Sequence, residues 1–114
     1  MTVPIYKGII YAILDEEYFY IGSTTKSIEE RINKHILESK TKVIKLYKYI
    51  NKVRGGWDNI IYICLEEIEC TKEELQSKEY EYITKYYNNF CLNTIKDVKQ
   101  GCIIRNYINK RRNN

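Results

Sequence analysis

The sequence is poor in the residues that build linkers, disulfide frameworks and membrane spans. Its 114 residues include one proline and five glycines, so Gly- or Pro-rich linkers are excluded, and each glycine is expected at a turn or a close approach. The four cysteines form no C-x-x-C pair, and the single histidine does not stand at zinc-site spacing. No secretory leader and no apolar run of about 18 residues is present. These absences favour an intracellular protein that does not contact membranes and whose thiols are free and mostly buried.

The length and the charge distribution limit the possible folds and binding partners. One compact domain fits in 114 residues, whereas a (β/α)₈ barrel needs about 250. The composition, 44% hydrophobic and 30% charged, is typical of a folded protein. Residues 1–93 carry a net charge of −1 and residues 94–114 a net charge of +5. The basic end, which includes Lys110, Arg111 and Arg112, is either a phosphate-binding segment or a solvated terminus.

Hydrophobic periodicity and capping signals predict six elements. In chain order they are strands over 5–14 and 18–22, a helix over 27–38, a helical stretch ending at Gly55-Gly56, a strand over 57–66 and a helix from 71 to about 87. Capping boxes open the first and last helices, at Ser27 with Glu30 and at Thr71 with Glu74. We expect an α/β (α+β) fold, a small three-stranded, antiparallel-rich sheet flanked by helices in the order β-β-α-α-β-α. A short segment, 91–93, returns to the core.

The first hairpin carries two tyrosines whose relative position depends on its loop. Strand alternation groups Tyr11 with Ile9 and Ile13 on one face of the first strand, and Tyr20 with Tyr18 and Gly22 on one face of the second. The loop length therefore decides whether the two tyrosines share a side. With a two-residue loop that pairs residues 14 and 17, Tyr11 lies directly opposite Tyr20, whereas a three-residue loop separates their faces. Without further evidence, the pair is a stabilising cross-strand contact.

A carboxylate interrupts the apolar stripe of the last helix. Glu79 falls in line with Leu75 and Ile83, and burial of a carboxylate is costly unless a cation pairs with it. Arg31 is one candidate, in a structural salt bridge, and a divalent metal is the other. Arg31 and His35 stand four residues apart, so both project from the same side of their helix.

Five motifs in a fixed order carry a resemblance to a known family. They are Tyr11, Tyr20-Ile21-Gly22 nine positions later, Arg31-x-x-x-His35, Glu79, and Leu92-Asn93. Together they make residues 6–93 resemble the GIY-YIG nuclease family. The first Gly-Ile-Tyr of that family reads Ile9-Ile10-Tyr11 here, with the glycine one place earlier at Gly8.

The resemblance implies a metal-dependent DNA endonuclease domain over residues 1–93, followed by the basic tail over 94–114. Glu79 would hold a single Mg²⁺ or Mn²⁺ ion, because Mg²⁺ commonly keeps several waters and uses one carboxylate. Arg31 would bind the scissile phosphate. Tyr11 resembles the tyrosine proposed as general base in that family, and Tyr20 and His35 would orient the attacking water or relay its proton. The resemblance also implies two supporting residues: Gly22, where a side chain would obstruct substrate approach, and Asn93. From their charge, the candidate DNA contacts are Lys26, with a solvated lysine as the alternative, and Lys110, Arg111 and Arg112 of the basic end.

Alternatives remain at this level. The protein would act on DNA as a monomer or a transient dimer, and a structure-specific repair or recombination nuclease of the same family fits the same motifs. A catalytically idle DNA-binding module and a structural protein whose tyrosines merely pack are the rivals from other classes. The last of these predicts no metal binding and no salt-dependent affinity for DNA.

Overall fold

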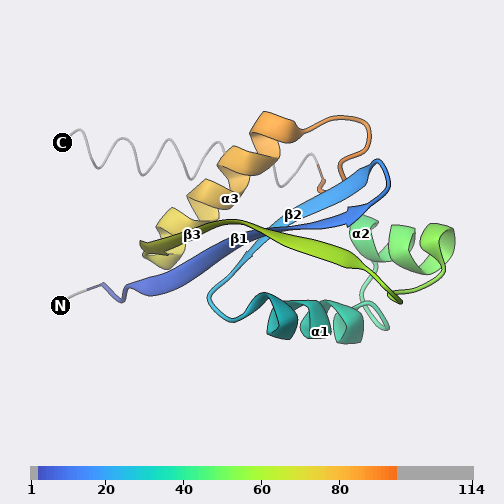
Figure 1. Ribbon diagram of the computed structural model, residues 1–114, viewed down its shortest axis with the longest axis horizontal. Helices are drawn as coiled ribbons and strands as arrows, with labels where there is room; N and C mark the ends of the chain where they lie inside the picture. The colour runs from blue at the N-terminus through green and yellow to red at the C-terminus, as the bar shows by residue number, and fades with distance from the viewer. Residues whose placement is uncertain (1–2, 95–114) are drawn as a thin grey trace.

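The protein is a three-stranded antiparallel sheet with helices on both faces (Figure 1). The computed structural model describes residues 3–94. Its elements are β1 (Tyr6–Asp15), β2 (Tyr18–Thr24), α1 (Ile28–Glu38), α2 (Lys45–Lys48), the π-helical stretch η1 (Tyr49–Arg54), β3 (Ile61–Cys70) and α3 (Lys72–Tyr86). The strand order is β2-β1-β3. The fold class and the order β-β-α-α-β-α predicted from the sequence are confirmed.

The middle strand β1 is buried on both faces, which explains its nearly continuous apolar sequence. Tyr11 and Ile13 pack in the cluster formed with α1, α2 and η1, where Ile32 and Ile50 lie. The intervening Ile10 packs in a second cluster on the opposite face, together with β2 and α3. The sheet therefore separates two small cores. Among residues 3–94, no helix has both the length and the apolar character needed to cross a membrane.

The hairpin register differs from the predicted one by two positions. The turn is Glu16-Glu17, with Asp15 paired to Tyr18, because Glu16 adopts the left-handed conformation, with φ of 55°, that closes the chain at this point. Tyr11 is consequently opposite Gly22, and the predicted pairing of Tyr11 with Tyr20 is wrong. Since the shift is even, both tyrosines remain on the face covered by α1.

The third strand begins four residues later than predicted. Trp57 lies in a turn and packs on the α1 side, where its Nε1 donates a hydrogen bond to Ser39 Oγ (3.0 Å). The strand instead continues to Cys70, which pairs with Tyr6. Its many glutamates are tolerated because β3 is an edge strand with a solvent-facing side.

The second helical stretch is shorter and less regular than its apolar spacing suggests. It starts at Lys45 and, as predicted, ends before the Gly55-Gly56 pair. Val43, whose spacing indicates the apolar face of this stretch, instead precedes it and is 73% exposed. Of the three described cysteines, Cys70 and Cys91 are buried and Cys64 is exposed. The fourth, Cys102, lies outside the described residues.

The segment after α3 closes the free edge of β2. Phe19 donates a backbone hydrogen bond to Phe90 O (3.1 Å) and accepts one from Leu92 N (2.7 Å). Asn93 continues this pairing with its side chain, donating to Ile21 O and accepting from Ile21 N, both at 2.9 Å. The predicted return of 91–93 to the core is confirmed, and these residues are buried.

The capping box of α3 gives a first prediction. Thr71 Oγ1 accepts a hydrogen bond from Glu74 N (3.1 Å), and the Glu74 carboxylate accepts one from Thr71 N (3.0 Å). Thr71→Ala should lower the free energy of unfolding by about 1 kcal/mol, measured by urea denaturation. Thr84→Ala, on the exposed surface of the same helix, should change it by less than about 0.5 kcal/mol. Equal effects of the two changes would contradict a role for the cap.

Candidate active site

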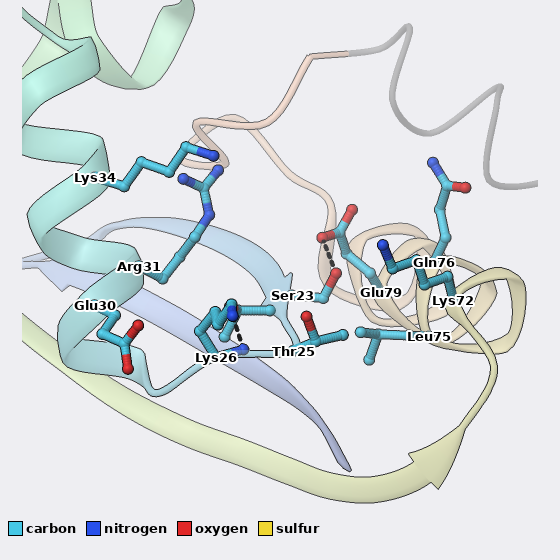
Figure 2. Close-up of a pocket in the computed structure, with 11 residues that line it drawn as sticks. Ser23, Thr25, Lys26, Glu30, Arg31, Lys34, Lys72, Leu75, Gln76 and Glu79 are labelled. Carbon is cyan, nitrogen blue, oxygen red and sulfur yellow. Dashed lines mark hydrogen bonds between the residues drawn. The ribbon is translucent and has the colours of Figure 1, made fainter. Parts of the chain in front are cut away.

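An open cleft of about 690 Å³ lies between α1 and α3, at the end of β2. Figure 2 shows Arg31 and Lys34 on the α1 wall, with Glu79, Gln76 and Lys72 on the α3 wall. Lys26, in the loop between β2 and α1, also lines the cleft. The two helices thus bring together a carboxylate and several cations that are distant in sequence.

Glu79 lies at the border of the cleft. Ser23 Oγ donates a hydrogen bond to Glu79 Oε1 (2.8 Å), and the glutamate is half-buried. The sequence placed Glu79 inside the apolar stripe of α3, but the buried part of that stripe is narrower than predicted. Leu75 and Ile83 are buried, whereas Tyr86 is 48% exposed. The carboxylate therefore keeps access to solvent and to a ligand.

Tyr11 and His35 are the centre of a buried chain of hydrogen bonds on the α1 face of the sheet. Tyr11 Oη lies 2.7 Å from His35 Nε2, and His35 Nδ1 lies 2.8 Å from the Tyr47 hydroxyl. Tyr11 and His35 have no exposed surface, and Tyr47 is 1% exposed. The ring of Tyr20 meets the His35 ring edge-on, with centroids 5.6 Å apart. These four side chains come from β1, β2, α1 and α2.

Burial determines the protonation states of His35 and Tyr11. It lowers the pKa of His35 to about 3, with the nearby Arg31 charge acting in the same direction. Burial also raises the pKa of Tyr11 well above its usual value, although the Arg31 guanidinium opposes this by charge and hydrogen bonding. Both follow because a low-dielectric environment disfavours the charged form. At neutral pH the pair is therefore a neutral phenol beside a neutral imidazole.

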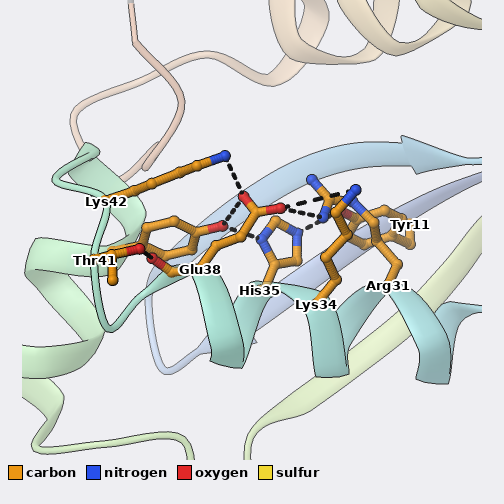
Figure 3. Close-up of polar contacts among 8 residues, drawn as sticks. Tyr11, Arg31, Lys34, His35, Glu38, Thr41 and Lys42 are labelled. Carbon is orange, nitrogen blue, oxygen red and sulfur yellow. Dashed lines mark hydrogen bonds and ion pairs between the residues drawn. The ribbon is translucent and has the colours of Figure 1, made fainter.

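Arg31 has a hydrogen-bond donor that lacks an acceptor. Its Nη1 is buried without a hydrogen-bond partner and lies 3.9 Å from Glu38 Oε1, in a long ion pair. Glu38 also pairs with Lys34 and Lys42 (Figure 3). A buried donor without an acceptor is costly, so this nitrogen keeps hydrogen-bonding capacity for a further acceptor.

Two glycines allow close packing around the site. A Cβ at Gly22 would meet the Tyr11 Oη and Cζ atoms, the latter at 2.5 Å. The sequence suggested that Gly22 keeps the substrate path open, and the structure adds that it makes room for Tyr11. Gly8, the displaced glycine of the first motif, accommodates Leu75 Cδ1 of α3, which would lie 2.6 Å from a Cβ there.

Several contributors carried no sequence signal of their own. Tyr47 stands in an apolar pattern that predicts only packing, and Glu38 is one of many charged helix residues. Ser23 follows Gly22 directly, so strand alternation turns its side chain to the α3 face, but nothing in the sequence indicates its bond to Glu79. Lys110, Arg111 and Arg112 lie outside the described residues.

The side chains that line the cleft offer a metal ion oxygen donors rather than nitrogen or sulfur donors. Within residues 3–94, no three His, Cys, Asp or Glu side chains gather at one point. The oxygen donors that line the cleft are the carboxylates of Glu79 and Glu30, the Gln76 amide, and the hydroxyl groups of Ser23, Thr24 and Thr25. Such oxygen donors suit Mg²⁺ or Mn²⁺, and Mg²⁺ keeps several of its waters. The expected N and S ligands of a structural zinc site are lacking there.

Comparison with protein families finds a match to the GIY-YIG catalytic domain over residues 7–93. No match is found among curated proteins or among solved structures. The family match covers both walls of the cleft, the Tyr11–His35 pair and the segment that closes the edge of β2.

The close contact between Gly22 and Tyr11 gives a second prediction. Gly22→Ala should destabilise the protein by about 1 to 3 kcal/mol because the ring is fully buried and cannot move aside freely. In a Tyr11→Phe background the cost should be smaller, since the phenol oxygen is the nearest atom. Thermal unfolding of the two single variants and the double variant measures this coupling. Strictly additive effects would rule out the contact.

The neutral state of His35 gives a third prediction. The unfolded chain binds a proton at His35 near pH 6.5, whereas the folded protein does so only near pH 3. The free energy of unfolding should therefore fall as pH decreases through this window, by at most about 1.4 kcal/mol per pH unit. Melting temperatures between about pH 7.5 and about pH 5 should drop less for His35→Gln than for the wild type. An identical drop in both proteins would show that His35 is not the responsible group.

Proposed function

The chain belongs to the GIY-YIG family, and on that basis we propose that it is a DNA endonuclease that hydrolyses phosphodiester bonds with one divalent cation. Membership implies nuclease activity and a nucleic-acid substrate. The observation that carries the finer proposal is the cleft itself, where Glu79 and Arg31 face the same open space from opposite walls (Figure 2).

Each residue of the cleft supports one requirement of phosphodiester hydrolysis. Arg31 offers a forked set of donors that matches phosphate oxygens better than a lysine does. Lys26, Lys34 and Lys72 line the same space and would neutralise the phosphates that flank the scissile bond. The net charge of +5 over residues 94–114 would add to the binding of the DNA backbone.

Glu79 would hold the cation, with the Ser23 hydrogen bond fixing the orientation of its carboxylate. A bound Mg²⁺ would act as a Lewis acid on phosphate and water oxygens. Tyr11 has no exposed surface in the free protein, so the complex with DNA would have to bring the attacking water to its hydroxyl. Tyr11 would then remove a proton from this water, and His35 stands within hydrogen-bond distance to receive the phenol proton. Tyr20 packs against His35 and would help to orient these groups. Residues 1–93 would form the catalytic unit, acting as a monomer or a transient dimer.

Nicking of supercoiled plasmid with and without Mg²⁺ or Mn²⁺ tests the proposal. Glu79→Gln and Arg31→Ala should each lower the rate at least about 100-fold, because each removes a group aimed at charge that develops in the transition state. Glu73→Gln, an exposed glutamate on the same helix that does not line the cleft, is the matched control and should cleave normally.

Cleavage by Glu79→Gln or Arg31→Ala at the wild-type rate would overturn the assignment. DNA binding without cleavage by the wild type would favour an idle binding module instead. Linear, branched and single-stranded DNA run in parallel would separate a plain duplex nuclease from a structure-specific one.

A further inference from the structure

We propose that Tyr47 and Glu38 are positioning residues that fix the tautomer of His35, so that its Nε2 lone pair accepts the Tyr11 proton. The proposal rests on the proposed function, since it assigns a direction to the proton transfer within that site. Neither residue stands in any of the five sequence motifs.

The direction of each hydrogen bond follows from counting donors and acceptors from Glu38 through Tyr47 and His35 to Tyr11. The Tyr47 hydroxyl donates to Glu38 Oε2 (3.4 Å), and an ionised carboxylate can only accept. The one hydrogen of Tyr47 is thus engaged, so its oxygen accepts from His35 Nδ1–H at 2.8 Å. A neutral imidazole has a single N–H, and its Nε2 must therefore accept from Tyr11 O–H at 2.7 Å.

Glu38 is held in the acceptor state by its neighbours. A hydrogen bond and the charge of Lys42 lower the pKa of its carboxyl, and Arg31 and Lys34 act in the same direction by charge. Arg31 and Lys34 come from the preceding turns of α1, and Lys42 comes from the loop after it (Figure 3). The hydrogen bonds that start at Tyr11 therefore end at the Glu38 carboxylate, a fixed negative charge. Its role is comparable to that of the carboxylate that orients a histidine in hydrolytic triads.

The chain also balances the charge that the reaction creates. As Tyr11 Oη takes a proton from water, its own proton moves to His35 Nε2, and the water oxygen uses the freed electron pair to attack phosphorus. The P–O bond to the leaving oxygen breaks with its electron pair, and that oxygen takes a proton from solvent. His35 is then a buried imidazolium, which burial and the Arg31 charge disfavour. Its Nδ1–H still points through Tyr47 to the Glu38 carboxylate, whose charge opposes these two effects.

The experiment uses Tyr47→Phe, which removes the hydroxyl and keeps the buried ring. Because the chain has one histidine, ¹⁵N spectra of the imidazole report on His35 alone and distinguish a protonated from an unprotonated nitrogen. The wild type should show Nδ1 protonated and Nε2 unprotonated. Tyr47→Phe should shift the ring toward the Nε2-protonated form and lower kcat by about 10- to 100-fold, with KM changed by less than about twofold.

Tyr49→Phe is the matched control. It removes a hydrogen-bonded hydroxyl that contacts Asp15 rather than His35, and it should leave both the ¹⁵N spectrum and kcat unchanged. Thermal unfolding of the two variants shows that each is folded at the assay temperature.

Two results would overturn the proposal: an Nε2-protonated His35 in the wild type, or a Tyr47→Phe protein with wild-type kcat. Failure of the proposed function is a separate outcome, because a wild type without nuclease activity still gives a tautomer spectrum. A wild type that cleaves DNA but has the opposite tautomer would remove only the positioning role.

Discussion

The packing of the Tyr11 ring against the backbone at Gly22 fixes the geometry on which the rest of the site depends. The two residues are directly paired between β1 and β2, and the Tyr11 ring occupies the space that a Cβ at Gly22 would need. The phenol oxygen thereby lies 2.7 Å from His35 Nε2, and both side chains are buried. A bulkier residue at position 22, or a register change of one position, would move this oxygen away from the histidine.

The two-faced sheet keeps the neutral and the charged parts of the site apart. Tyr11, His35 and Tyr47 lie in the α1-side core, where burial keeps the imidazole and the phenols uncharged. Glu79 reaches the cleft from the opposite face, near solvent. The Glu79 charge still acts on Tyr11, so the pair proposed to relay a proton and the carboxylate proposed to hold a cation can be neighbours without either being buried with an unpaired charge.

Local signals in the sequence were sufficient for the fold but not for all of the site. The capping box at Thr71, the apolar run of β1 and the motif spacing predicted the elements and their order, because these features act over a few residues. The start of β3 was misplaced because Trp57 packs through a turn, and the hairpin register because Glu16 adopts a conformation uncommon for its type. Tyr47 could not be assigned to the polar chain, since only the folded structure brings its hydroxyl to His35 from a separate helix.

The closure of the β2 edge by residues 90–93 has a consequence for the order of folding. Ile21 and Asn93 are separated by 72 positions, so this pairing closes the longest loop among the side-chain hydrogen bonds described here. While the chain is synthesised, β1, β2 and α1 are available long before Asn93 emerges. The strand that carries Tyr20 and Gly22 therefore keeps an open edge until late, and a rigid cleft forms only when nearly the whole catalytic domain has been made.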